Sequence, residues 1–281
     1  MKTSKFDLLF NTVSYVYIVL LSLLLAYPVI YTIVGSFKTN MELVLGGSFL
    51  PKQFILDNYI EAFTKGGFTR YSLNSVIVSS AVTFLDTGTA SMSGFAFSRY
   101  NFFGKKFFIT LFVALMFVNL GSITMYPTYR VLHAAKLTGS LLGIIIGMVG
   151  GQTGNILLIM GFTKTIPREM DEAAIIDGCG MYKIYFLIIL PMLRPILAVV
   201  ALFAFRGAWN DYIWTLIMTI SRPHLRTLSV AVAQLRYATN DAASWNLMVA
   251  GAAIAVIPIL IVYAFAHNQF ISGLTSGAVK G

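Results

Sequence analysis

Long apolar runs separated by short polar stretches make up most of this chain. An α-helix needs about 20 mostly apolar residues to cross the hydrocarbon core of a bilayer. Runs of that length predict six membrane-spanning helices, at about 13–36, 73–97, 107–128, 139–163, 184–205 and 247–268. A shorter apolar patch at 207–220 predicts either an extension of the fifth span or a half-helix. An even number of spans places both termini on the same side of the membrane.

The basic residues between the spans predict the direction of insertion. The short stretch 98–106 contains Arg99, Lys105 and Lys106, and the C-terminal stretch contains Lys280. Lys and Arg also occur in the stretches predicted to lie outside, but these are longer. The positive-inside rule gives most weight to short loops and to residues near the span ends. We therefore expect both termini to be cytoplasmic.

Composition supports a membrane protein with one domain, 1–281. The chain is 57% hydrophobic and only 11% charged, whereas soluble domains contain about 25% charged residues. The formal net charge of +9 is spread over short stretches between spans, which is typical of membrane loops and not of a nucleic-acid-binding face. The uncharged run 8–37 is longer than the roughly 7–15 residues of a signal-peptide core, so it predicts a retained first span. The expected fold class is all-α integral membrane protein.

Several motifs of enzymes and metal sites are missing from the sequence. It has one cysteine and three widely separated histidines, so it predicts no internal disulfide and no metal site. It also lacks a phosphate-binding G-x-x-x-x-G-K-[ST] loop and the protease motifs H-E-x-x-H and G-x-S-x-G. We therefore expect a transporter that is not an enzyme and that takes its energy from another subunit or from an ion gradient.

A few polar residues lie inside the predicted spans: Asp86, Gln152 and Asn155. A polar side chain in hydrocarbon is costly, so these residues should face protein or a wet pathway. For Asp86 an ion pair with Arg206, or with a partner subunit, is an equally good interpretation. Glycines recur every fourth residue in the fourth span, at 143, 147 and 151, and predict a smooth face for close helix packing.

Four acidic residues interrupt the apolar pattern within one short stretch: Glu169, Asp171, Glu172 and Asp177. Acidic side chains at the start of a helix complement its dipole. The pattern predicts a surface helix capped by Thr165, with Pro167 in its first turn and a stop at Gly178. A second helix is expected to begin near Met181 and to enter the membrane.

This stretch has the spacing E-A-A-x3-G-x9-I-x-L-P, formed by Glu172, Ala173, Ala174, Gly178, Ile188, Leu190 and Pro191. It resembles the EAA signature of the permeases of ABC importers. The resemblance implies the type I importer permease fold, with six transmembrane helices and a cytoplasmic coupling helix that docks into a cleft of an ATPase subunit. It also implies that Glu172 pairs with a basic ATPase residue and that Gly178 allows the bend.

Other stretches resemble the carbohydrate branch of these permeases, in particular the maltose type. They are SFLPKQFILDNYIEAF at 48–63, FSRY at 97–100 and GLTSGAVKG at 273–281. The resemblance implies that a C-terminal tail, about 271–281, reaches the interface between two ATPases. The tail residues concerned are Gly273, Leu274, Thr275, Gly277 and Lys280.

The same resemblance implies a set of partners. They are a second permease subunit, two ATPase subunits and an extracytoplasmic binding protein, in a bacterial plasma membrane. The chain itself would need no cofactor, because ATP and magnesium would bind to the ATPase subunits. The substrate would be a sugar or an oligosaccharide.

An aromatic and polar stretch, FRGAWNDYIW at 205–214, is a candidate for the substrate pathway. Its residues Trp209, Asn210, Asp211 and Tyr212 combine flat apolar faces with hydrogen-bonding groups, which suit the two faces of a sugar. The W-N-[DE]-[FY] pattern also resembles one found in carbohydrate permeases. An aromatic belt at the membrane interface would explain the same residues.

Three alternatives stay open at this point. Arg222, Arg226 and Arg236, with Arg130 and Lys136, could attract an acidic oligosaccharide, although solvated loop charges are the commoner explanation of such residues. An ABC importer for amino acids or phosphate would share the EAA signature. An ion-coupled secondary transporter would require inverted repeats with broken helices, and no repeat is visible in the sequence.

Overall fold

The computed structural model describes residues 5–64, 66–118, 121–150, 153–235 and 244–278. Within these ranges the chain forms helices joined by short connections, and no strand occurs, as the sequence predicts. The structure divides into two compact units, 1–68 with 231–257 and 69–230 with 258–281. The single domain predicted over 1–281 stays a prediction.

The first unit contains α1 (Lys5–Gly35), α2 (Asn40–Leu45), α3 (Asp57–Thr64) and the first part of α15 (Trp245–Ala278). Within α1, Phe10–Gly35 has a mean hydropathy of 2.3 and is long enough to span a membrane, as predicted. The buried amide of Asn58 joins the ends of these helices. It donates to the carbonyls of Ser36 (2.8 Å) and Lys38 (2.9 Å) and accepts from Asn246 (2.8 Å).

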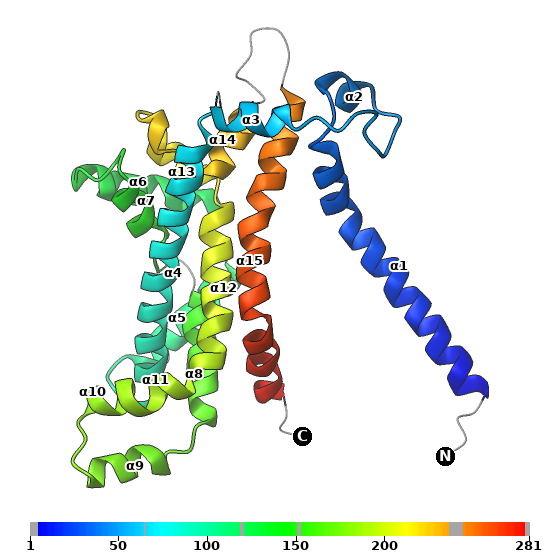
Figure 1. Ribbon diagram of the computed structural model, residues 1–281. Helices are drawn as coiled ribbons and strands as arrows, with labels where there is room; N and C mark the ends of the chain where they lie inside the picture. The colour runs from blue at the N-terminus through cyan, green and yellow to red at the C-terminus, as the bar shows by residue number, and fades with distance from the viewer. Residues whose placement is uncertain (1–4, 65, 119–120, 151–152, 236–243, 279–281) are drawn as a thin grey trace. The chain divides into compact units, whose positions relative to one another are not determined.

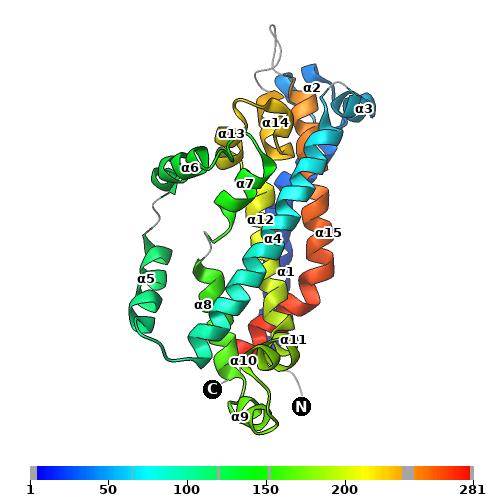
Figure 2. The ribbon, with the colours of Figure 1, turned by 90° about the vertical axis from the view of Figure 1, so that its left-hand side faces the viewer.

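The second unit is built on three long helices, α4 (Phe68–Arg99), α8 (Thr153–Thr165) and α12 (Arg194–Asn210) (Figure 1). At one end lie the short helices α6 (Met125–Ala134), α7 (Leu141–Met148) and α13 (Ile213–Thr219), and at the other end lies α9 (Glu169–Ile176) (Figure 2). The remaining elements are α5 (Lys105–Phe117), α10 (Met181–Lys183), the π-helical turn Ile184–Ile189, α11 (Leu190–Met192) and the start of α14 (Leu228–Gln234). The last turns of α15 lie at the same end as α9.

The predicted span 73–97 is one uninterrupted helix, α4, of 32 residues. It is rich in Ser and Thr, and some of their hydroxyls bond to the helix itself. Ser79 donates to the Ser75 carbonyl and Thr83 to the Ser79 carbonyl, each at 2.6 Å. Because these two hydroxyls find their partners one turn back, their side chains can be buried or face apolar surroundings without an unpaired group.

Three other spans were predicted as single helices, and this is wrong for all three. The predicted span 107–128 stops at the end of α5, Phe117, and a new helix starts at Met125. Pro127 lies in the first turn of that new helix, α6, where its missing N–H removes no helical bond.

The other two broken spans are sharply bent. The predicted span 139–163 is α7 followed by α8, with a bend of 53° and a left-handed Gly150 (φ 83°) between them. The predicted span 184–205 is not one straight helix. Two helical segments, Met181–Met192 and Arg194–Asn210, replace it, and the chain bends by 80° between them. Pro195 explains this bend, because its ring cannot donate to the carbonyl of Pro191 and displaces it.

By length and composition, two described helices can each cross a membrane, Phe10–Gly35 and Trp245–Phe265. Each of the two bent pairs could form one more span. The predicted C-terminal tail, 271–281, is not separate from the last helix, since α15 continues to Ala278. No proline occurs there, and isolated glycines weaken a helix by only about 1 kcal/mol each relative to alanine.

Candidate functional site

The surface helix predicted from the acidic stretch is α9, and it begins later than expected. The prediction that Thr165 caps it is wrong, because Thr165 ends α8 and its hydroxyl donates to the Phe162 carbonyl (2.8 Å). Arg168 precedes the first turn of α9 and makes no side-chain cap. Glu169, Asp171 and Glu172 occupy that turn as predicted, where their charge offsets the helix dipole.

The predicted stop at Gly178 is confirmed. Gly178 adopts a left-handed φ of 77°, its N–H donates to the Ile175 carbonyl (3.0 Å), and the Cys179 N–H donates to the Ala174 carbonyl (2.8 Å). These two bonds form a Schellman motif, which satisfies the last carbonyls of the helix. The chain then turns into α10, which begins at Met181 as expected.

Replacing Gly178 with alanine is expected to destabilise this turn by about 1–2 kcal/mol, because an L-residue is strained at positive φ. The matched control is Gly180→Ala, since Gly180 has φ −77° and an added Cβ meets nothing within 4 Å at either position. Limited proteolysis of 165–181 in membranes measures the difference. Equal cleavage rates in the two variants would contradict this account of the turn.

Two inward-facing residues, Asp171 and Ala174, attach α9 to the second unit. Asp171 forms an ion pair with Arg99, the last residue of α4, with 2.7 Å between Oδ2 and Nε. Ala174 is 6% exposed and packs in a core cluster with Ile166 and Ile184. Burial raises the pKa of the nearby Tyr100 phenol and the Asp171 carboxylate raises it further, so Tyr100 stays neutral at physiological pH.

The other face of α9 is open. Glu172 and Ala173 are exposed, and Ile176 is 86% exposed. A carboxylate beside an exposed isoleucine and an alanine forms a surface that is partly apolar and can be approached closely. We call these three residues the outer face of α9.

The rest of the EAA spacing lies in the segment after α10. Ile188 belongs to the π-helical turn and Leu190 begins α11; both are half-buried against the core cluster, whereas Pro191 is exposed. The Leu190 N–H donates to the Tyr185 carbonyl, five residues back. This wider turn fits the proline that follows, because Pro191 cannot continue the ordinary bonding pattern.

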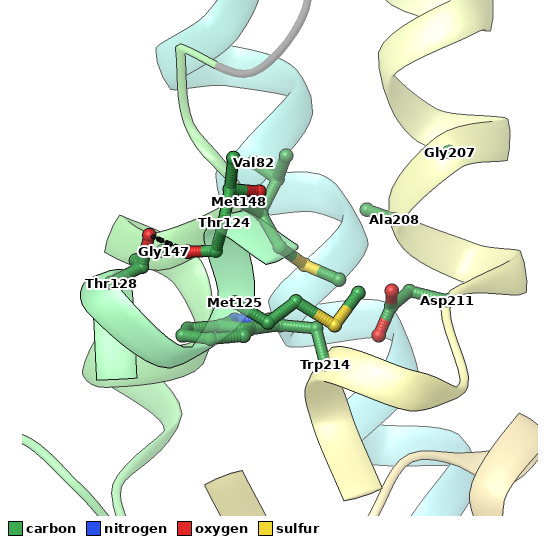
Figure 3. Close-up of a pocket in the computed structure, with 10 residues that line it drawn as sticks. All are labelled: Val82, Thr124, Met125, Thr128, Gly147, Met148, Gly207, Ala208, Asp211 and Trp214. Carbon is green, nitrogen blue, oxygen red and sulfur yellow. Dashed lines mark hydrogen bonds between the residues drawn. The ribbon is translucent and has the colours of Figure 1, made fainter. Parts of the chain in front are cut away.

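A cavity of about 380 Å³ lies at the other end of the second unit (Figure 3). Its lining comes from α4, the short 3-10 helix η1 (Gly121–Thr124), α6, α7, α12, α13 and the residue between the last two: Val82, Thr124, Met125, Thr128, Gly147, Met148, Gly207, Ala208, Asp211 and Trp214. The carboxylate of Asp211 accepts bonds from the N–H and the hydroxyl of Thr215, both at 2.9 Å. Threonines, one carboxylate and apolar side chains thus share one concave surface.

The predicted pathway residues around 209–212 separate in the structure. Asp211 lines the cavity, Asn210 is exposed and Tyr212 is half-buried. Trp209 is only 2% exposed and stacks on Phe205 with 5.6 Å between ring centroids. Trp214 belongs to the same aromatic stretch, 205–214, and its side chain contributes to the cavity wall.

Asp86 is buried in α4, and its described partners are on the broken span. Its carboxylate accepts from the Asn155 amide (2.8 Å) and from the Gly150 N–H (3.4 Å). The suggested ion pair with Arg206 does not form, since Arg206 is exposed and no ion pair joins it to Asp86 among the described residues. Asp86 and Asn155, two of the three polar residues noted inside the predicted spans, are therefore hydrogen-bonded to each other. The third, Gln152, lies outside the described residues.

The predicted glycine face is in contact with α13. A Cβ on Gly143 would lie 2.8 Å from Met218 Cε, and one on Gly147 would overlap the ring of Trp214. Gly151 lies outside the described residues. In the C-terminal stretch, Gly273, Leu274, Thr275 and Gly277 belong to α15, and Lys280 lies outside the described part.

Neither the role of Arg99 nor most of the cavity lining is apparent from the sequence. In the sequence Arg99 is one of several basic residues near a span end. Its partner Asp171 lies far along the chain, and no local spacing connects the two. Thr124, Thr128 and Met148 gave no signal either, because threonine and methionine are ordinary residues of membrane helices.

The family model for the binding-protein-dependent transport system inner membrane component matches residues 3–275. The chain belongs to this family. Membership agrees with the resemblance drawn from the EAA spacing and places the chain among membrane permeases, which are not enzymes themselves. It also excludes the ion-coupled secondary transporter.

Relatives in this family include permeases with named sugar substrates. The chain is 31% identical to the maltodextrin transport system permease protein MdxG of Bacillus subtilis, covering 100% of both chains. It is 32% identical to the galactooligosaccharides transport system permease protein GanQ of the same species, covering 95% of each. It is 30% identical to the arabinooligosaccharides transport system permease protein AraQ of Halalkalibacterium halodurans, covering 91% of each.

A solved structure has the same fold. It is described as a crystal structure of a bacterial ABC transporter involved in the import of the acidic polysaccharide alginate. The TM-score is 0.82 at 22% sequence identity, over 96% of this chain and 99% of that one. The chain therefore has the fold of an ABC transporter permease.

Proposed function

We propose that this chain is one of two membrane subunits of an ATP-driven, binding-protein-dependent importer of oligosaccharides. The outer face of α9 carries this proposal. It lies at one end of the second unit, and the cavity lies at the other. Such a separation suits a protein that receives energy on one side of the membrane and substrate from the other.

The proposed topology has six spans and cytoplasmic termini. The spans are α1, α4, α5, the bent pair α7–α8, the bent pair ending in α12, and α15. In this arrangement α9 is a cytoplasmic coupling helix. The last turns of α15 lie at the end of the second unit where α9 lies, which supports a role for the C-terminal stretch near the ATPases.

The proposed partners are a second permease, two ATPase subunits and an extracytoplasmic binding protein. ATP-driven closure of the ATPases would move α9, and hydrolysis would reverse the movement. The membrane subunits would alternate between outward-facing and inward-facing states because each partner binds one state better than the other. In this scheme Glu172 pairs with a basic residue of the ATPase.

The cavity and the relatives support a sugar as substrate. The sugar names of the relatives concern those proteins, and they make an oligosaccharide the leading proposal here. Hydroxyls of Thr124 and Thr128, the Asp211 carboxylate and the Trp214 ring offer hydrogen bonds and an apolar surface. Because the described lining includes the Asp211 carboxyl group and no Lys or Arg, we favour a neutral oligosaccharide over the acidic one suggested by Arg222 and Arg226.

Co-purification tests the proposed function. The wild-type chain, co-expressed with its cognate second permease and ATPase, is expected to recover the ATPase from detergent. Glu172→Lys should reduce this recovery by about tenfold, because it reverses a charge on the outer face of α9. Asp57→Lys is the matched control, since it makes the same change at an exposed residue of α3.

Failure to recover ATPase with the wild-type chain would refute the proposed function. The same preparation, supplied with its binding protein, identifies the substrate class through stimulated ATP hydrolysis. Neutral oligosaccharides are expected to stimulate, and uronate oligomers are not. Stimulation by uronates alone would replace the neutral sugar with the acidic one.

A further inference from the structure

The ion pair between Arg99 and Asp171 connects the proposed coupling helix to a helix of the proposed pathway. Both side chains are largely buried, with 6% and 16% exposure, and 2.7 Å separates Nε from Oδ2. Arg99 also donates from Nη2 to the Ile166 carbonyl (3.0 Å), just before α9. One guanidinium thus binds both the segment leading into α9 and the first turn of α9.

The remaining attachment of α9 is small. Ala174 is the only buried residue of this helix, one turn beyond Asp171 on the same face. Pro167 and Arg168 before α9 are exposed, as are Asp177 and Gly178 after it. Asp171 and Ala174 therefore carry the contact, and of these two only Asp171 contributes a charge.

Arg99 belongs to the helix that forms part of the cavity wall. The helix α4 is uninterrupted from Phe68 to Arg99, and Val82 on it lines the cavity. At 1.5 Å per residue, Val82 and Arg99 lie about 25 Å apart along one helix. Because α4 has no break between these two residues, it provides a continuous path from Arg99 to Val82.

We propose that Arg99 is a positioning residue that transmits the movement of α9 to α4 and so to the cavity wall. This inference rests on the proposed function and adds the route between its two sites. Hydrophobic contact through Ala174 alone would let α9 slide. The ion pair opposes such sliding, since displacing either partner leaves a buried charge unpaired.

The experiment uses the complete transporter in proteoliposomes and measures two quantities, sugar transported per ATP hydrolysed and ATPase recovered on purification. Asp171→Asn keeps the shape and removes the charge. We expect normal ATPase recovery and basal hydrolysis, with about tenfold less sugar transported per ATP. Glu169→Gln is the matched control, an exposed carboxylate in the same turn, and should behave as wild type.

A charge exchange separates coupling from simple structure. The double variant Arg99→Asp with Asp171→Arg restores the pair in reverse and should recover transport per ATP above either single variant. Wild-type coupling in Asp171→Asn would overturn the inference, as would loss of bound ATPase in that variant or failure of the exchange to rescue. Absence of ATPase from the wild-type preparation would instead refute the proposed function, and this inference with it.

Discussion

Gly147→Ala is expected to abolish transport by preventing α7 and α13 from packing. A Cβ at this position would overlap Cζ2 of Trp214 and lie 2.6 Å from Cε2 and 2.9 Å from Nε1. The indole has little room to move, because it is 5% exposed and its Nε1 donates to the Ile144 carbonyl (3.2 Å). Overpacking of this kind typically costs about 1–3 kcal/mol and sometimes more.

The cost at Gly147 also affects the cavity, since both Gly147 and Trp214 line it. We therefore expect a lower melting temperature of the purified chain together with loss of sugar uptake. The control is Gly161→Ala in α8, where an added Cβ meets nothing within 4 Å. Normal uptake in Gly147→Ala would show that the close contact between α7 and α13 is not needed.

Asp86→Leu is expected to have the second large effect, because it removes an acceptor that the buried Asn155 amide and the Gly150 N–H share. Leucine has a similar bulk but cannot accept from the Asn155 amide or the Gly150 N–H. Loss of a buried hydrogen bond to a charged group costs about 1.5–3 kcal/mol. The connection between α7 and α8 loses its link to α4, so sugar uptake and thermal stability should both fall.

Asp86→Asn distinguishes the hydrogen bonds from the charge. Asparagine can still accept a bond through its carbonyl oxygen, so a structural role predicts uptake much closer to wild type than in Asp86→Leu. Melting temperature and uptake of the two variants in the same vesicles provide the comparison. Equal loss in both variants would mean that the negative charge itself is required.

The sequence was sufficient to predict the features that depend on local chemistry. The uncharged run 8–37 predicted α1, and the left-handed Gly178 followed from an acidic helix that needs a stop. The EAA spacing predicted the family because its fixed positions lie within one stretch of chain. These signals need no knowledge of distant contacts.

Breaks and long-range pairs could not be predicted in the same way. Hydropathy is averaged over a window, so the run 139–163 appears continuous although Gly150 interrupts it. Pro195 was visible, yet a proline inside an apolar run does not reveal whether the helix kinks slightly or turns by 80°. The pairs Arg99–Asp171 and Asp86–Asn155 depend on how helices associate, which no local pattern encodes.

The narrow attachment of α9 has an evolutionary consequence. Asp171 and Ala174 face inward, while Glu172, Ala173 and Ile176 are exposed. Mutations at Glu172, Ala173 or Ile176 can therefore accumulate without unfolding the permease. A lineage that retains this chain could exchange one ATPase subunit for another by altering a few side chains on one short helix. By the same route, several transporters could share a single ATPase.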